Sequence, residues 1–143
     1  MISLYYTWME HSEGRAFACH MLGCHEDDIR IAPGGKPYLP GGPHFSISHS
    51  GGMVLVAVCE DSPIGCDVEP ANRAVKNEAA IRRKLFPGED DVPFLKLWTA
   101  YEARLKSGLG EAAEILFCDA HADFIVAVAA PKGETLAQIS YLG

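Results

Sequence analysis

The stretch FSISHSGGMVLVAVCEDSPIGCDVE, residues 45–69, carries the pattern that decides the fold. Apolar and polar residues alternate over Phe45–His49, which predicts a strand with one buried face. A glycine turn follows, and the apolar run Met53–Cys59 predicts a strand buried on both faces. After a second turn, Ile64–Glu69 predicts another strand. The stretch therefore predicts a meander of three closely spaced strands, with the acidic third strand in a central position.

Shorter elements are predicted on both sides of this meander. A helical pattern that begins at Ser12 or Glu13 ends before Gly23, a typical helix stop. The longest helical pattern is Asp91–Gly108, with large apolar side chains at helical spacing. Four prolines and four glycines within 33–43 predict a shaped loop rather than a helix. The other expected elements are strands at 2–6, 28–32, 115–119 and 124–129, a helix at 78–85 and a tail at 138–142.

The bulk properties of the chain limit its class and its partners. It has 143 residues, 48% apolar and 22% charged, which is typical of a single globular domain. The formal net charge of −7 argues against nucleic acid as the main partner, because no basic excess exists to neutralise a phosphate backbone. The first residues lack the basic segment of a signal peptide, and no apolar run is long enough to span a bilayer. We therefore expect a cytoplasmic protein with free cysteines and no membrane association.

Two acidic clusters contain the candidate reactive residues. Asp67 and Glu69 are two residues apart, so both carboxylates point to one face of the predicted strand. Glu102 lies in the predicted long helix, and Lys106 follows one turn later. Three carboxylates beside a cation suit Mg²⁺ that holds a phosphate ester. Two simpler interpretations stay open: solvent-facing acids on an edge strand, and an ordinary helical ion pair between Glu102 and Lys106.

Two other polar segments have the chemistry to bind a phosphorylated ligand. Ser48 and His49 end a predicted strand beside a glycine turn, where a hydroxyl and an imidazole can donate to a phosphate. They do not form a Ser-His nucleophile pair, because adjacent strand residues face opposite ways. His49 is equally consistent with a turn histidine. Gly35-Lys36-Pro37, taken alone, is consistent with a turn that exposes a lysine.

The order of these motifs resembles that of the 4'-phosphopantetheinyl transferase superfamily, in its surfactin-synthetase-activating branch. Members of that branch carry G-K-P, F-N-x-S-H-S, G-(I/V)-D-(I/V)-E and W-(S/T)-x-K-E-(A/S)-x-x-K in this order. The corresponding segments here are Gly35-Lys36-Pro37, Phe45–Gly51, Gly65–Glu69 and Trp98–Lys106. The resemblance covers about residues 35–108, roughly half of the chain.

The resemblance implies an enzyme, a holo-[acyl-carrier-protein] synthase or 4'-phosphopantetheinyl transferase. Such an enzyme uses Mg²⁺ to transfer the 4'-phosphopantetheine group of coenzyme A to a serine of an acyl or peptidyl carrier protein, releasing adenosine 3',5'-bisphosphate. The alternatives are a degenerate, non-catalytic member that binds coenzyme A or a partner protein, and a different Mg²⁺-dependent phosphoryl-transfer enzyme. The implied roles are metal ligation by Asp67, Glu69 and Glu102, catalysis by Glu102 and Lys106, and coenzyme A binding by Gly35, Lys36, Pro37, Ser48, His49 and Tyr101.

Tyr101 stands where members of that branch have a lysine, and its hydroxyl can donate a hydrogen bond to a phosphate. The fold implied by the resemblance is α+β, the 4'-phosphopantetheinyl transferase fold. It consists of two abbreviated pseudo-symmetric halves, each with a small antiparallel sheet and a helix, at about 1–58 and 63–142 of a single domain. Both motif sets lie in one chain, so a monomer is expected, with a dimer as the alternative.

Overall fold

The structure is a computed structural model that describes residues 1–9 and 13–143. The described part is an α+β arrangement, as expected, with three α-helices and three sheets that are mostly antiparallel. Two short 3₁₀ turns lie at Glu26–Asp28 and Gly110–Ala112. In chain order the other elements are β1 (Ile2–Trp8), α1 (Gly14–Leu22), β2 (Arg30–Ile31), β3 (Pro37–Tyr38), β4 (His44–Ser50), β5 (Met53–Cys59), β6 (Gly65–Pro70), α2 (Glu78–Leu85), α3 (Phe94–Ser107), β7 (Ala113–Cys118), β8 (Phe124–Pro131) and β9 (Leu136–Tyr141).

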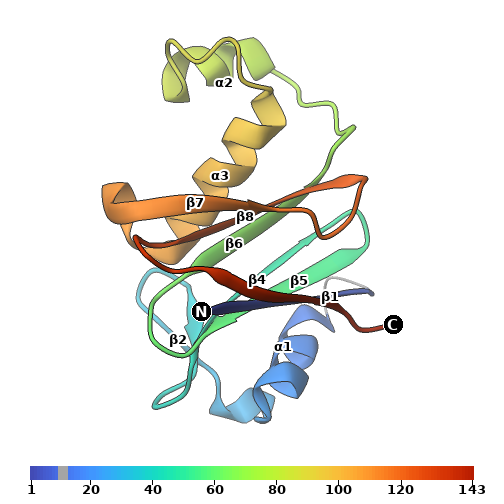
Figure 1. The fold of residues 1–143 in the computed structure, drawn as a ribbon, viewed down its shortest axis with the longest axis vertical. Coiled ribbons are helices and arrows are strands. Elements are labelled where there is room, and N and C mark those ends of the chain that lie inside the picture. Colours follow the sequence, from blue (N-terminus) through green and yellow to red (C-terminus); the bar gives the residue numbers. More distant parts are fainter. Residues whose placement is uncertain (10–12) are drawn as a thin grey trace.

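The largest sheet has four strands in the order β4-β5-β1-β9. β4 and β5 form an antiparallel hairpin, and β1 pairs with the other edge of β5. β9 comes from the C-terminal part of the chain, yet it runs parallel to β1 in the same sheet. The tail expected at 138–142 is therefore largely a strand, and the second half of the chain contributes it to a sheet otherwise built from the first half (Figure 1).

The predicted three-stranded meander is wrong in its third strand. β6 leaves the first sheet and pairs with β8 in a three-stranded sheet of order β6-β8-β7. β6 is also the edge strand of that sheet, so the central position predicted for it is wrong as well. The strands predicted at 115–119 and 124–129 are present as β7 and β8, which pair with each other as an antiparallel hairpin.

The elements stack in four layers, which Figure 1 shows from α1 at the bottom to α3 near the top. The main core lies between the two larger sheets, where Leu55 of β5 and Val68 of β6 are fully buried. A second cluster lies between the four-stranded sheet and Phe17 of α1. A third joins Ala103 of α3 to alanines of β8. The two sheets adjoin at β4 and β6, which lie side by side.

Local sequence signals account for the helix ends. Gly23 and Gly108 follow α1 and α3 with φ of 70° and 72°, the left-handed conformation that terminates a helix at low cost for glycine. α1 agrees with the predicted helix from Gly14 onward, while Ser12 lies outside the described residues. The glycine- and proline-rich loop is interrupted by β3, which pairs with β2 in a two-stranded hairpin.

Two further observations bear on the class of the protein. All five cysteines are free, as predicted, and four of them are buried. Burial raises the pKa of Cys118 to about 12. Within the described ranges, no helix combines the length and the apolar character that crossing a bilayer requires.

Candidate functional site at the junction of the two sheets

Asp67 of β6 is the centre of the site, and only 6% of its surface is exposed. Its Oδ1 atom accepts a hydrogen bond from Ser48 Oγ at 3.1 Å and lies 3.2 Å from Lys106 Nζ. Lys106 Nζ also donates to the Ile47 carbonyl oxygen at 3.4 Å. One carboxylate thus connects a strand of each sheet with the last turn of α3.

The surroundings of Asp67 favour its protonated form. Burial raises the pKa of this carboxyl to about 6, although the Lys106 ammonium and the Ser48 hydroxyl oppose the rise. The negative charge of Glu69 also raises the pKa of Asp67. Asp67 Oδ2 is buried and has no hydrogen-bond partner within the described residues. A cation or a donor that reaches this oxygen would therefore be stabilised there.

Ser46 and Ser48 connect β4 to the free edge of β6. The backbone N–H of Cys66 donates to Ser46 Oγ at 3.0 Å, and that of Val68 donates to Ser48 Oγ at 3.1 Å. The two hydroxyls take the place of a neighbouring strand for N–H groups that would otherwise be buried without acceptors. This role for Ser46 and Ser48 is not apparent from the motif, although their spacing of two already places both hydroxyls on one face of a strand.

Lys36 reaches the same junction from the loop before β3. Its ammonium donates to the Lys106 carbonyl oxygen at 2.7 Å and to the Ile64 carbonyl oxygen. A cation at this position satisfies a carbonyl at the C-terminal end of α3, where the helix dipole also favours positive charge. Burial lowers the pKa of Lys36. The interpretation of Lys36 as an exposed lysine in a turn is therefore wrong. Its ammonium links the loop, the start of β6 and the end of α3.

A cavity of about 330 Å³ opens beside this junction. Three of the segments singled out in the sequence contribute to its wall, although they are far apart along the chain. Its lining residues are Gly34, Gly35, Lys36, Pro37, Phe45, Ser46, Ile47, Leu105 and Lys106. The cavity is therefore bounded by the loop at 34–37, by β4 and by the last turn of α3.

The other two candidate metal ligands do not join Asp67 in a single cluster. Glu69 is buried on β6, and Arg73 donates to its Oε2 atom. Glu102 is half-buried on α3, one turn before Lys106. Lys106 forms its ion pair with Asp67, and among the described residues it forms none with Glu102, so the simple helical pair is not what the structure contains.

The fit of these residues to Mg²⁺ is therefore partial. Carboxylate oxygens are the ligands that Mg²⁺ prefers, and the unpartnered Asp67 Oδ2 has no competing contact. As the side chains lie, no three His, Cys, Asp or Glu residues in the described part of the chain are grouped closely enough to hold a metal ion. Ligation by Asp67, Glu69 and Glu102 together requires Glu69 to exchange Arg73 for the metal and Glu102 to turn toward Asp67.

His49 and Tyr101 lie away from Asp67. His49 is exposed and follows the buried Ser48 on β4, so the two side chains point to opposite faces of the strand. The Tyr101 ring is in contact with Phe86 and Trp98, at centroid distances of 5.8 Å to each. It lines a different cavity, on another side of α3. Of the expected coenzyme A contacts, Gly35, Lys36 and Pro37 line the cavity at the junction.

Comparison with known proteins adds no assignment to this geometry. A scan against protein-family models finds no match, and no curated protein matches the chain.

Proposed function

We propose that this protein is a 4'-phosphopantetheinyl transferase that moves the phosphopantetheine group of coenzyme A to a serine of an acyl or peptidyl carrier protein. The overall arrangement would then be an abbreviated form of that family's fold, with the two larger sheets as its two halves. The observation that carries the proposal is the meeting of the four motif segments at one junction. Lys36, Phe45 and Lys106 line one cavity, and Lys106 contacts Asp67.

The proposed roles follow from the chemistry of each group. The cavity beside Gly35-Lys36-Pro37 has room for a flat ring against backbone and proline. Lys106 would neutralise a phosphate oxygen, and it would then exchange Asp67 for the ligand. Phosphoryl transfer depends mainly on positioning and charge neutralisation, which a rigid junction of two sheets and a helix can supply. Glu102 would accept the proton of the attacking serine.

Mg²⁺ is part of the proposal, with Asp67, Glu69 and Glu102 as its ligands. When bound, the ion would supply the positive charge that allows a pyrophosphate to approach three carboxylates. Calorimetry with Mg²⁺ and coenzyme A tests this directly, because binding must weaken in the Asp67→Ala variant. The loss of the Asp67 carboxylate is also expected to lower transfer by about a hundredfold or more.

The decisive experiment incubates the chain with coenzyme A, Mg²⁺ and an apo carrier protein, and follows the carrier by mass spectrometry. The expected result is a mass increase of one phosphopantetheine group, lost with Asp67→Ala and retained with Asp61→Ala, an exposed acid in the turn before β6. Equal transfer by both variants would refute the metal assignment.

The non-catalytic alternative has one observation in its favour. Tyr101 lies in an aromatic cluster rather than at the junction, so the position of the family's lysine contributes no charge there. Metal-dependent binding of coenzyme A with no modification of any carrier protein would identify the chain as a binding relative. Absence of coenzyme A binding would exclude the transferase and leave only a relative that binds a partner protein.

A further inference from the structure

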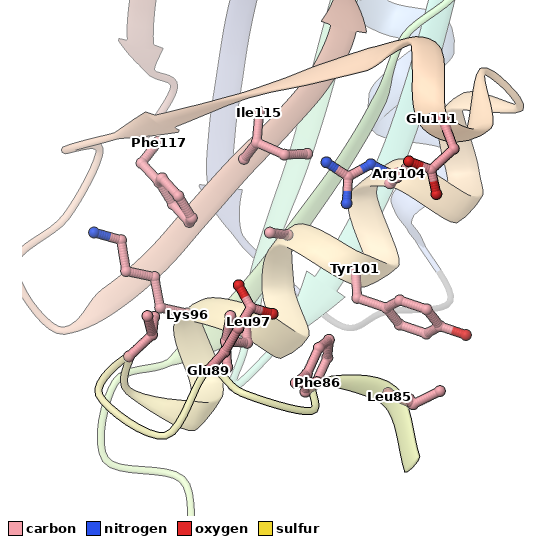
Figure 2. Close-up of a pocket in the computed structure, with 12 residues that line it drawn as sticks. Leu85, Phe86, Glu89, Lys96, Leu97, Tyr101, Arg104, Glu111, Ile115 and Phe117 are labelled. Carbon is pink, nitrogen blue, oxygen red and sulfur yellow. The ribbon is translucent and has the colours of Figure 1, made fainter. Parts of the chain in front are cut away.

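Figure 2 shows a second cavity, which has a volume of about 470 Å³. It lies on a different side of α3 from the junction. Arg104 lines it, whereas Lys106 faces Asp67, and residues two apart on a helix lie on nearly opposite sides. The other walls come from the chain around Phe86, after α2, and from Phe117 of β7. Its volume is in the range of small-molecule sites.

An unpaired guanidinium is the main polar feature of this cavity. Arg104 Nε is buried, and among the described residues the Arg104 side chain has neither a hydrogen-bond partner for this atom nor an ion pair. Arginine stays charged at any ordinary pH, and a donor shielded from water without an acceptor is costly. A planar guanidinium is best satisfied by a carboxylate that accepts two parallel hydrogen bonds. A bound molecule with such an acceptor would therefore satisfy Arg104.

Aromatic rings form much of the remaining wall. Phe86 and Tyr101 are in edge-to-face contact, with ring centroids 5.8 Å apart. At the other end, Lys96 Nζ lies 4.7 Å from the centroid of the Phe117 ring. Rings of this kind bury an aromatic or aliphatic body with a large gain from apolar contact. The ligand thus needs an apolar part in addition to its charged group.

The charges of the wall limit the charge of the ligand. Lys96 and Arg104 are cationic, and Glu89 and Glu111 are anionic, so the lining has no formal net charge. Figure 2 shows Glu111 and Arg104 directed toward the same part of the cavity, with Lys96 and Phe117 toward the other end. Glu111 would repel a multiply charged phosphate more strongly than a single carboxylate, so the wall favours a monoanion beside Arg104.

We infer that this cavity binds a small monocarboxylate with an aromatic or aliphatic body, and that Arg104 holds the carboxylate. This site is separate from the coenzyme A site proposed above. Binding to it is measured without coenzyme A, Mg²⁺ or carrier protein. Its outcome therefore does not depend on whether the chain is a transferase.

The test uses 4-phenylbutyrate as the probe, with its neutral amide and phenyl phosphate as comparison ligands, in calorimetry and ligand-observed NMR. We expect the carboxylate to bind more tightly than either comparison ligand. Arg104→Met should weaken its binding by about tenfold or more, because a hydrogen bond to a charged group is lost. Arg83→Met, an exposed arginine of α2, should have no effect.

A second variant, which is expected to change the affinity in the opposite direction, makes the test independent of whether Arg104→Met folds. Glu111→Gln removes a negative charge from the cavity and should tighten 4-phenylbutyrate binding by about threefold. Glu114→Gln, an exposed acid of β7, is the matched control and should leave binding unchanged. Equal affinity for the acid and the amide, or no response to Glu111→Gln, would overturn the assignment. So would a complete lack of binding.

Discussion

At the residue scale, Asp67 is a carboxyl whose chemistry differs from its behaviour in water. It lies at the end of α3, with one oxygen shared by Ser48 and Lys106 and the other without a partner among the described residues. Such a site holds a proton more tightly than the unfolded chain does, because burial penalises the charged form. A cation bound at the unpartnered oxygen would stabilise the ionised form of Asp67.

The pH dependence of stability follows from this carboxyl. Its pKa is raised from 3.8 to about 6, so its favourable contribution is fully present below pH 4 and is lost as the pH rises through 6. For this group alone, the free energy of unfolding falls by up to roughly 3 kcal/mol over that window. Asp67→Asn removes the titration. Urea unfolding of both proteins between pH 4 and 7, in the presence of a chelator, should therefore give a stability difference that moves in favour of the variant as pH rises.

The outcome that contradicts this prediction is a stability difference that does not change with pH. That result would mean that Asp67 titrates in the folded protein as it does in the unfolded chain. Carboxyls that do not interact with Asp67 affect both proteins equally, so they cancel in the comparison.

At the element scale, the decisive contact is that of α3 on β6. A Cβ atom built on Gly65 would lie 2.2 Å from the Ala103 carbonyl oxygen and 2.4 Å from the Ser107 backbone nitrogen. Backbone atoms cannot move aside as a flexible side chain can, so glycine is required where the strand begins. This close approach also brings Lys106 to Asp67.

Gly65→Ala is therefore expected to destabilise the protein by about 3 kcal/mol, since the helix must move away from the strand. Chemical denaturation gives the measurement. Gly34→Ala is the control, because no atom lies within 4 Å of the Cβ it would carry and its φ is not positive. Equal stability of the two variants would show that α3 shifts without cost.

Local sequence patterns predicted most helices and strands but not the partners of the strands. Met53–Cys59 and Glu78–Leu85 were predicted with the bounds that the structure has, because periodicity and turn residues act within a few residues. The pairing of β6 was missed, since its edge N–H groups are satisfied by two serine side chains rather than by the neighbouring strand in sequence. No local pattern encodes that choice.

For the same reason, only part of the candidate site could be predicted from the sequence. The shared face of Asp67 and Glu69 follows from strand geometry alone. The helical spacing of four favours a Glu102–Lys106 pair, but Lys106 instead meets Asp67, where lower solvent exposure strengthens the attraction. The contact between Glu69 and Arg73 joins β6 to the irregular segment that follows it, and sequence spacing has no predictive rule for such a pair.

At the scale of the whole molecule, the two sheets are joined by polar contacts as well as by the core. Replacing Ser46 and Ser48 by alanine leaves the N–H groups of Cys66 and Val68 buried without acceptors. Each replacement should lower the free energy of unfolding by about 1–3 kcal/mol. Ser3→Ala on β1 is the control, because the Ser3 hydroxyl forms no hydrogen bond with the described residues.

The measurement is urea unfolding of the double variant followed by two probes, far-UV circular dichroism and tryptophan fluorescence. We expect a lower midpoint for Ser46→Ala/Ser48→Ala and an unchanged midpoint for Ser3→Ala. A double variant as stable as the parent would mean that water replaces both hydroxyls at no cost.

The parallel pairing of β1 with β9 gives the molecule a direction in which it resists force. Ile2 lies opposite Leu136, and Tyr6 lies opposite Tyr141, so the chain enters the sheet at one end of this pair and leaves at the other (Figure 1). Tension applied through the two termini slides the strands along each other and loads all their hydrogen bonds at once. Tension that peels β9 away from one end would break them one after another. A tether through the termini therefore loads this strand pair in shear rather than peeling it apart.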